Sequence, residues 1–419
     1  MTHLWTLRRS VVFASLFAGC VLLAQDKRTW EDNFLRGAEA VRSGRYPEAR
    51  QVLLTALEQS RSFDANDLRR ASTYAVLATV YQLQGEPALA DPLFLEARAI
   101  LESNGEAGRS SLAFVLDSIG QLRMEEGRWG EAEQLMKQSR LLYEQTGGKD
   151  SLTSMTAVRH LGELYGCIGR QAEAEELLKQ AETVLRRSEP SGALTATLIS
   201  LGHIYVIEGR YNLAEPPLKE AMQLSIKIHD GDPSSADAMM NLAVLYRVEG
   251  QTDRAGPLLR KAAKIYTDAG DPHLAGALAE TGLIALGDRK YAMAEKNLQE
   301  ALAILTRVSG TENISVALVE VSLAQVYLSE RDYAKAESYI RHALAKERTF
   351  LGDSSFEVAK SLLIAAQIEE KQNRQAEAQS DYCEAVTLYG KSIGADHPEA
   401  LHAQALYTRF VKKMRRAGP

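Results

Sequence analysis

The sequence predicts an all-α protein built from about nine helix hairpins. A six-residue string ending in alanine recurs nine times, at intervals of 39 to 42 residues. Small and large apolar residues flank each copy at helical spacings of four and seven. Only 7% of the residues are aromatic, which favours helices over sheets. One hairpin cannot bury both of its faces, so we expect the copies to stack as a solenoid.

The first 24 residues are unlike the rest of the chain. Arg8 and Arg9 precede an uncharged apolar run over residues 11–24. This run is shorter than the roughly 20 residues that a transmembrane helix needs. A basic start, a short apolar run and small residues are typical of a secretory signal peptide, with cleavage after Ala24. Residues 25–29 would then form a short linker.

A second interpretation of this segment stays open. Residues 17–20 (FAGC) resemble a bacterial lipobox, in which Cys20 would be lipidated and become the new N-terminus. Either signal predicts export to the periplasm or cell envelope. The membrane would be contacted only through that lipid anchor or through an uncleaved signal.

The repeats predict a solenoid over residues 30–397. Each copy is expected to contain two helices, A and B, joined by a turn near residue 44, 85, 127, 169, 209, 250, 289, 331 or 373. Six of these turns have glycine, which adopts the left-handed conformation that ends a helix without a steric penalty. Asn373 can also adopt it, whereas Arg289 and Arg331 do so less readily.

Three further positions define how helices A and B pack. Seven residues before each turn, helix A has glycine or alanine, which permits close approach of a second helix. Helix B contains the invariant alanines and, four residues after each, a large apolar residue that fills the next turn. The alanines are Ala49, Ala90, Ala132, Ala174, Ala214, Ala255, Ala294, Ala336 and Ala378.

The last segment, residues 398–419, predicts an amphipathic capping helix with a basic tail. Leu401, Leu406, Phe410 and Met414 share one face, which would cover the open end of the stack. The basic residues that follow would complement the negative end of the helix dipole.

The repeat pattern resembles the tetratricopeptide repeat family. Repeat five carries the full pattern: Leu201, Gly202, Tyr205, Gly209, Tyr211, Ala214, Leu218 and Ala221. The long period, the strings ADPLF, AEPPL and AGPLL, and the GADHPEA linker are similar to the kinesin-light-chain variety. Ala40, Arg123 and Glu369 depart from it, because each stands where the family has a tyrosine or another bulky residue.

This resemblance implies a right-handed solenoid that binds extended peptides or helices in a concave groove lined by helix A. It places at the groove a set of residues that are polar in the middle repeats and apolar toward the C-terminus. Asn241 is the strongest single candidate, because family members use asparagine there to bind ligand backbone. The set is Asp117, Gln121, Arg159, His160, Glu163, His203, Asn241, Arg247, Val321 and Leu328.

The sequence contains none of the common catalytic, phosphate-binding or zinc-binding motifs. A net charge of −6 gives no reason to expect nucleic-acid binding. Cys167 and Cys383 are expected to be buried free thiols, because they lie five repeats apart. We therefore expect a non-catalytic scaffold, without a cofactor or metal, that binds a protein or peptide partner.

The alternative is an envelope solenoid that binds a small ligand, a glycan or a metal. His160 and Glu163 are three residues apart in helix A of repeat four, a spacing that can supply two metal ligands. His203 occupies a comparable level in the next repeat.

Overall fold

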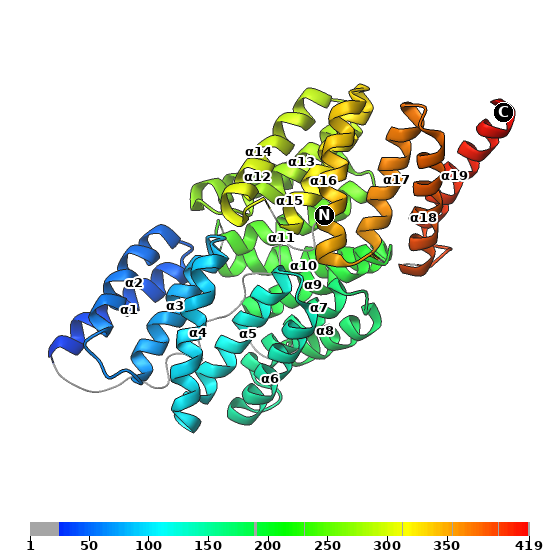
Figure 1. The fold of residues 1–419 in the computed structure, drawn as a ribbon. Helices are drawn as coiled ribbons and strands as arrows, with labels where there is room; N and C mark the ends of the chain where they lie inside the picture. Colours follow the sequence, from blue (N-terminus) through cyan, green and yellow to red (C-terminus); the bar gives the residue numbers. More distant parts are fainter. Residues whose placement is uncertain are drawn as a thin grey trace. The chain divides into compact units, whose positions relative to one another are not determined.

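The computed structural model describes residues 25–187, 191–229, 231–311, 313–353, 355–392 and 394–417. Within these ranges the regular structure is entirely helical, with nineteen α-helices, one 3-10 turn (Gly105–Gly108) and no strand (Figure 1). The predicted all-α fold is therefore confirmed. The predicted signal, including Cys20, lies outside the described residues. None of the described helices is both long and apolar enough to cross a membrane.

The helices alternate between the two roles that the repeats predict. Helix A of the nine hairpins is α1 (Gln25–Arg42), α3 (Leu68–Leu83), α5 (Arg109–Glu125), α7 (Leu152–Cys167), α9 (Gly192–Ile207), α11 (Pro233–Val248), α13 (Leu274–Gly287), α15 (Ile314–Glu330) and α17 (Phe356–Lys371). Helix B is α2 (Tyr46–Ser60), α4 (Pro87–Ser103), α6 (Trp129–Gly147), α8 (Gln171–Leu185), α10 (Tyr211–His229), α12 (Thr252–Ala269), α14 (Tyr291–Ser309), α16 (Tyr333–Leu351) and α18 (Gln375–Ser392). A final helix, α19 (Pro398–Ala417), packs against α18.

The chain divides into two compact units. The N-terminal unit holds the described residues up to 206 together with residues 211–274, and the C-terminal unit holds residues 207–210 together with the described residues from 275 onward. In both units, successive helices pack on one another, as α3 does on α4 and α5, and as α16 does on α17. Residues 25–29, which we expected to form a linker, are instead the start of α1.

The turn between helices A and B is left-handed in all nine hairpins. The φ angle is positive at the six glycines, and it is 60° at Arg289, 68° at Arg331 and 62° at Asn373. The arginine turns are closed by main-chain hydrogen bonds, such as the one from the Asp332 N–H to the Tyr327 carbonyl at 2.9 Å. These bonds satisfy carbonyl groups at the end of helix A and so offset the steric cost of a left-handed arginine.

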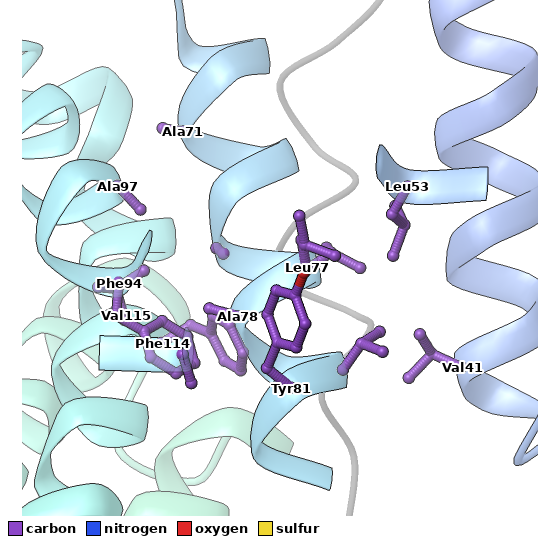
Figure 2. Packing of buried hydrophobic residues seen from close by; sticks show 14 of the residues in the cluster. Val41, Leu53, Ala71, Leu77, Ala78, Tyr81, Phe94, Ala97, Phe114 and Val115 are labelled. Carbon is purple, nitrogen blue, oxygen red and sulfur yellow. The ribbon is translucent and has the colours of Figure 1, made fainter. Parts of the chain in front are cut away.

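Helices A and B of one hairpin approach closely because the small residue of helix A faces the large residue of helix B. A Cβ atom added to Gly202 would lie 2.5 Å from Cγ of Leu218, which is fully buried. The same arrangement joins Gly37 to Leu53. In Figure 2, α3 presents Leu77 and Tyr81 between Leu53 on one side and Phe94 and Phe114 on the other.

The two helices of a hairpin are buried to very different extents. Thirteen of the sixteen residues of α11 are buried, whereas five of the eighteen residues of α12 are buried. Helix A is therefore covered on nearly all sides, and helix B is covered along one narrow stripe. Polar residues of helix A consequently have to find partners within the protein.

An acid–tyrosine contact joins several successive repeats. The residue after the invariant alanine is often glutamate, and the tyrosine of helix A in the next repeat donates its hydroxyl to that carboxylate. The pairs are Glu133–Tyr165 (2.9 Å), Glu175–Tyr205 (3.1 Å), Glu215–Tyr246 (3.2 Å) and Glu295–Tyr327 (2.6 Å). In the first repeat, the residue after the invariant alanine is Arg50 instead of glutamate. Its guanidinium lies 4.8 Å from the ring centroid of Tyr81 in the second repeat.

Arg123, one of the departures from the family pattern, has a structural explanation. In the preceding repeat, the residue after the invariant alanine is Asp91 rather than glutamate. Nη2 of Arg123 lies 2.7 Å from Oδ1 of Asp91. A second nitrogen contacts Glu126 at 3.1 Å. An ion pair thus replaces the acid–tyrosine contact between the second and third repeats.

The free cysteines differ from expectation in one respect. Cys383 is exposed, so the prediction that it is buried was wrong, and Cys167 is half-buried. Helix B is covered along one stripe, and Cys383 lies five residues after the invariant Ala378, outside that stripe. Desolvation of the Cys167 thiol, reinforced by the nearby charge of Glu163, raises its pKa to about 12.

Candidate binding face on the A helices

Eight of the ten predicted binding residues lie in the N-terminal unit. Asp117 and Gln121 belong to α5, and α7 carries Arg159, His160 and Glu163. The others in this unit are His203 on α9 and Asn241 and Arg247 on α11. Val321 and Leu328 lie on α15 in the C-terminal unit, where Val321 is buried and Leu328 is half-buried.

The structure links α5 and α7 through three of these polar side chains. Nδ1 of His160 lies 2.6 Å from Oδ2 of Asp117. The Gln121 amide donates to the same carboxylate oxygen at 2.9 Å, and it lies 3.4 Å from the His160 nitrogen. Asp117 and His160 are buried, whereas Gln121 is half-buried. Gln121 therefore forms the more exposed edge of a buried cluster.

Arg159 extends this cluster to α9. Its guanidinium contacts the Glu163 carboxylate and the Nε2 nitrogen of His160, and its side chain is 1% exposed. Ser200 of α9 then donates its hydroxyl to Glu163 Oε1 at 2.5 Å. We call the six residues Asp117, Gln121, Arg159, His160, Glu163 and Ser200 the polar seam.

Ser200 was not among the predicted residues. It stands two residues before Gly202, just as His160 stands two residues before Gly162. The equivalence of these two positions could have identified it. Serine at an apolar helix interface gave no chemical signal of its own.

Two buried atoms of the polar seam have no hydrogen-bond partner among the described residues. They are Oδ1 of Asp117, an acceptor, and Nε of Arg159, a donor. A buried polar atom without a partner is costly, and nearly all such atoms in proteins are satisfied. An acceptor and a donor are complemented by the two groups that a peptide offers, an N–H and a C=O.

Asn241 is used within its own helix. Its amide nitrogen donates to the main-chain carbonyl of Asp237 at 2.8 Å, and its side chain is buried. The Asp237 carboxylate accepts the Tyr266 hydroxyl at 2.5 Å. Arg247, one helical turn and a half further on, is half-buried. Arg247 is therefore the more accessible of the two predicted residues on α11.

The polar seam also bears on the metal alternative. Both ring nitrogens of His160 face other side chains, and Glu163 contacts Arg159 and Ser200. Across the described ranges, no group of three or more histidine, cysteine, aspartate or glutamate side chains is arranged to hold a metal ion. The contacts of His160 and Glu163 thus link neighbouring A helices.

Comparison with known proteins agrees with this repeat architecture. A tetratricopeptide repeat family model matches residues 37–103, 111–187, 194–268 and 273–349. The chain belongs to the tetratricopeptide repeat family. A search of curated proteins finds no match to this tetratricopeptide repeat protein.

Solved structures share its fold at low sequence identity. A Rap protein complexed with competence and sporulation factor is 11% identical, with a TM-score of 0.56, covering 84% of this chain and 99% of the Rap chain. Aspartyl phosphate phosphatase F of Bacillus subtilis is 12% identical, with a TM-score of 0.51, covering 80% and 98% of the two chains. A putative kinesin light chain from Podosopora anserina is 19% identical, with a TM-score of 0.39, covering 49% and 99%. At these identities the likeness to the first two structures concerns the fold alone.

Proposed function

We propose that this tetratricopeptide repeat protein is an exported, non-catalytic scaffold that binds an extended segment of a partner protein along its A helices. The fold class itself is typical of protein–protein interaction. The observation that carries the proposal is the polar seam, which crosses three successive A helices and leaves one buried acceptor and one buried donor without partners. A peptide backbone carries groups of both missing kinds, an N–H and a C=O.

The side chains of the seam, and Arg247 on α11, have different roles in this proposal. Gln121 and Arg247 are half-buried and contact the partner directly. Asp117 is more buried and holds the Gln121 amide in place through the 2.9 Å hydrogen bond. Charged and amide groups on rigid helices suit recognition of a peptide backbone and a few side chains. The Rap protein of similar fold forms a complex with competence and sporulation factor, which supports the proposal that this repeat fold holds a partner.

Binding is tested by crosslinking in cells followed by mass spectrometry, with the unchanged chain and two variants. Gln121→Glu and Arg247→Glu should reduce the recovery of a crosslinked partner at least tenfold, because each places a carboxylate where the partner needs a donor. The control is Arg260→Glu, which changes an exposed arginine on helix B α12. Equal recovery from all three variants, with unchanged helical circular dichroism, would show that the A-helix face does not bind the partner.

Export is proposed from the basic and apolar residues that precede α1. Mass spectrometry of the N-terminus of the mature protein tests it. A start at Gln25 supports a cleaved signal, and a lipidated start at Cys20 supports an envelope lipoprotein. An unprocessed Met1 in the cytosolic fraction would contradict export.

A further inference from the structure

The junction between the eighth and ninth repeats has carboxyl side chains at two positions that are neutral in most other repeats. The first is Glu347 on α16, eleven residues after the invariant Ala336. The equivalent residues of the other repeats are serine, leucine or tyrosine, and all are buried: Ser60, Leu101, Tyr143, Leu185, Ser225, Tyr266, Leu305 and Tyr389. Of the nine repeats, the eighth alone therefore has a carboxyl group at this core position.

Glu347 makes no hydrogen bond of normal geometry among the described residues. Its side chain is 0% exposed, and neither of its carboxylate oxygens is bonded to another described residue. The Ser361 hydroxyl of α17, also fully buried, is likewise unbonded within the described ranges. Burial raises the pKa of Glu347 to about 8, and the charge of Glu357 adds to this effect. The neighbouring Ser361 hydroxyl and the charge of Lys360 oppose it. Glu347 is consequently a neutral acid when the two repeats are docked at neutral pH.

The second position is Glu369 on α17, which stands where most A helices have tyrosine. In the preceding helix B, the residue after the invariant alanine is Glu337. At other junctions this contact pairs a tyrosine hydroxyl with a carboxylate, whereas at this junction it brings two carboxyl groups together. Oε2 of Glu369 is buried without a partner among the described residues. Burial raises the pKa of Glu369 to about 7, and the charges of Asp381, Glu377 and Glu337 act in the same direction, against Arg374.

Glu337 itself stays ionised. Although burial opposes it, the Gln372 amide at 2.9 Å and the Arg374 guanidinium at 3.0 Å keep the pKa of Glu337 below its usual value. Arg341 of the same helix also contacts this carboxylate. The proton at this site therefore belongs to Glu369.

Three pairs of opposite charges lie around the junction. Lys346 of α16 contacts Glu320 of α15 at 3.0 Å, and Arg348 contacts Glu384 of α18 at 2.9 Å. Lys413 of α19 contacts Glu370 of α17 at 2.9 Å. These pairs hold the junction together, and they leave Glu347, Glu369 and Asp381 outside them. The pKa of Asp381 is also raised, by burial and by the charge of Glu384, against Arg348 and Arg374.

We propose that the contact between α16 and α17 is a proton-dependent latch, in which the ninth repeat and α19 dock on the eighth repeat while Glu347 and Glu369 are protonated and loosen when these groups ionise. When the repeats separate, water reaches both groups and they titrate near the ordinary glutamate value of 4.5. Docking therefore weakens as pH rises from about 4.5 toward 8, by about tenfold per pH unit for each proton released. Above pH 8 both groups are ionised in the docked state as well, so docking does not weaken further.

Hydrogen exchange of the full mature chain, followed by mass spectrometry from pH 5.5 to 8.5 and corrected for intrinsic exchange rates, tests the latch. Peptides from α17, α18 and α19 should lose protection at least tenfold as pH rises, with the loss levelling off near pH 8. Peptides from α15 should change much less. Equal pH dependence in α15 and in α17–α19 would overturn the proposal, whether or not any variant folds.

Neutral variants identify the groups responsible. Glu347→Gln and Glu369→Gln should each reduce the pH dependence of α17–α19 protection, and the double variant should abolish it. The matched control is Glu295→Gln, which removes the carboxylate that accepts the Tyr327 hydroxyl at the preceding junction. It should lower α15 protection by a similar factor at every pH in this range. An undiminished pH dependence in the double variant would overturn the proposal.

Discussion

Arg159 and Glu163 are two charged side chains buried on α7, one of the A helices. Their side chains are 1% and 2% exposed, so each charge is stabilised by the other rather than by water. Ser200 donates to the same Glu163 oxygen that Arg159 contacts, and His160 contacts the other terminal nitrogen of Arg159. Breaking one contact should therefore leave a buried charge behind, with a larger penalty than at the surface.

Arg159→Met should lower the free energy of unfolding by about 3–5 kcal/mol, because it leaves Glu163 as a buried charge without its partner. Arg98→Met is the matched control, since Arg98 and Glu102 are also four residues apart but are 37% and 49% exposed. That change should cost at most about 1 kcal/mol. Urea unfolding followed by circular dichroism measures both, and equal costs would show that the Arg159 pair is not a buried ion pair.

The two cysteines should differ in reactivity. Thiolates rather than thiols react with alkylating agents. Because desolvation raises the pKa of the Cys167 thiol to about 12, Cys167 should be alkylated by iodoacetamide at pH 8 at least tenfold more slowly than the exposed Cys383. Peptide mass spectrometry follows each site. In urea both should react at one rate, and a fast Cys167 in the folded protein would contradict the environment described here.

At the scale of helices, the contact that joins one repeat to the next varies in chemistry while its position is constant. The acid–tyrosine pairs, the Arg50–Tyr81 contact and the Asp91–Arg123 ion pair all connect the residue after the invariant alanine to the same position of the following A helix. The first two junctions therefore have partners that differ from the glutamate–tyrosine pairs of four later junctions.

A compensating change tests this pairing at the junction of the second and third repeats. Arg123→Tyr alone should destabilise the protein by about 1–3 kcal/mol, because it removes charge-assisted hydrogen bonds to Asp91 and Glu126. Adding Asp91→Glu recreates the pair found at other junctions and should recover at least half of the loss. Urea midpoints give both values. No recovery in the double variant would mean that the two positions act independently.

The repeated positions also predicted the contacts between helices A and B and the turns that join them. Glycine or alanine in helix A predicts a close contact with helix B, and Gly202 against Leu218 confirms it. The nine turns could be located from the repeated string, including those at Arg289 and Arg331, where glycine is absent. The helical start of α1 was missed because residues 25–29 carry no repeat signal.

For the molecule as a whole, stability is expected to depend on contacts between neighbouring repeats. The C-terminal unit ends with α19, which packs its aromatic face on α18. Tyr382 lies 5.2 Å from Phe410 and 6.2 Å from Tyr407, measured between ring centroids. Without α19, this face of the last repeat would be open to water.

Deleting residues 398–419 should lower the hydrogen-exchange protection of α18 and α17 at least tenfold, because Tyr382 loses its cover. Protection of α15 should change by less than threefold, since α19 does not pack on it in the C-terminal unit. Mass spectrometry of exchanged peptides measures each helix at a fixed pH. A uniform loss from α14 to α18 would show that this unit unfolds as one cooperative body.

The sequence alone determined the family, the helical class, the number of hairpins and the places where they turn, because each depends on a local spacing that recurs nine times. It also named five members of the polar seam. Only the tertiary structure decided that these five are bonded to one another, that Ser200 joins them, and that Glu347 and Glu369 are uncompensated at one junction. Those properties depend on which side chains meet across separate helices and on how far water is excluded from them, and a one-dimensional pattern fixes neither.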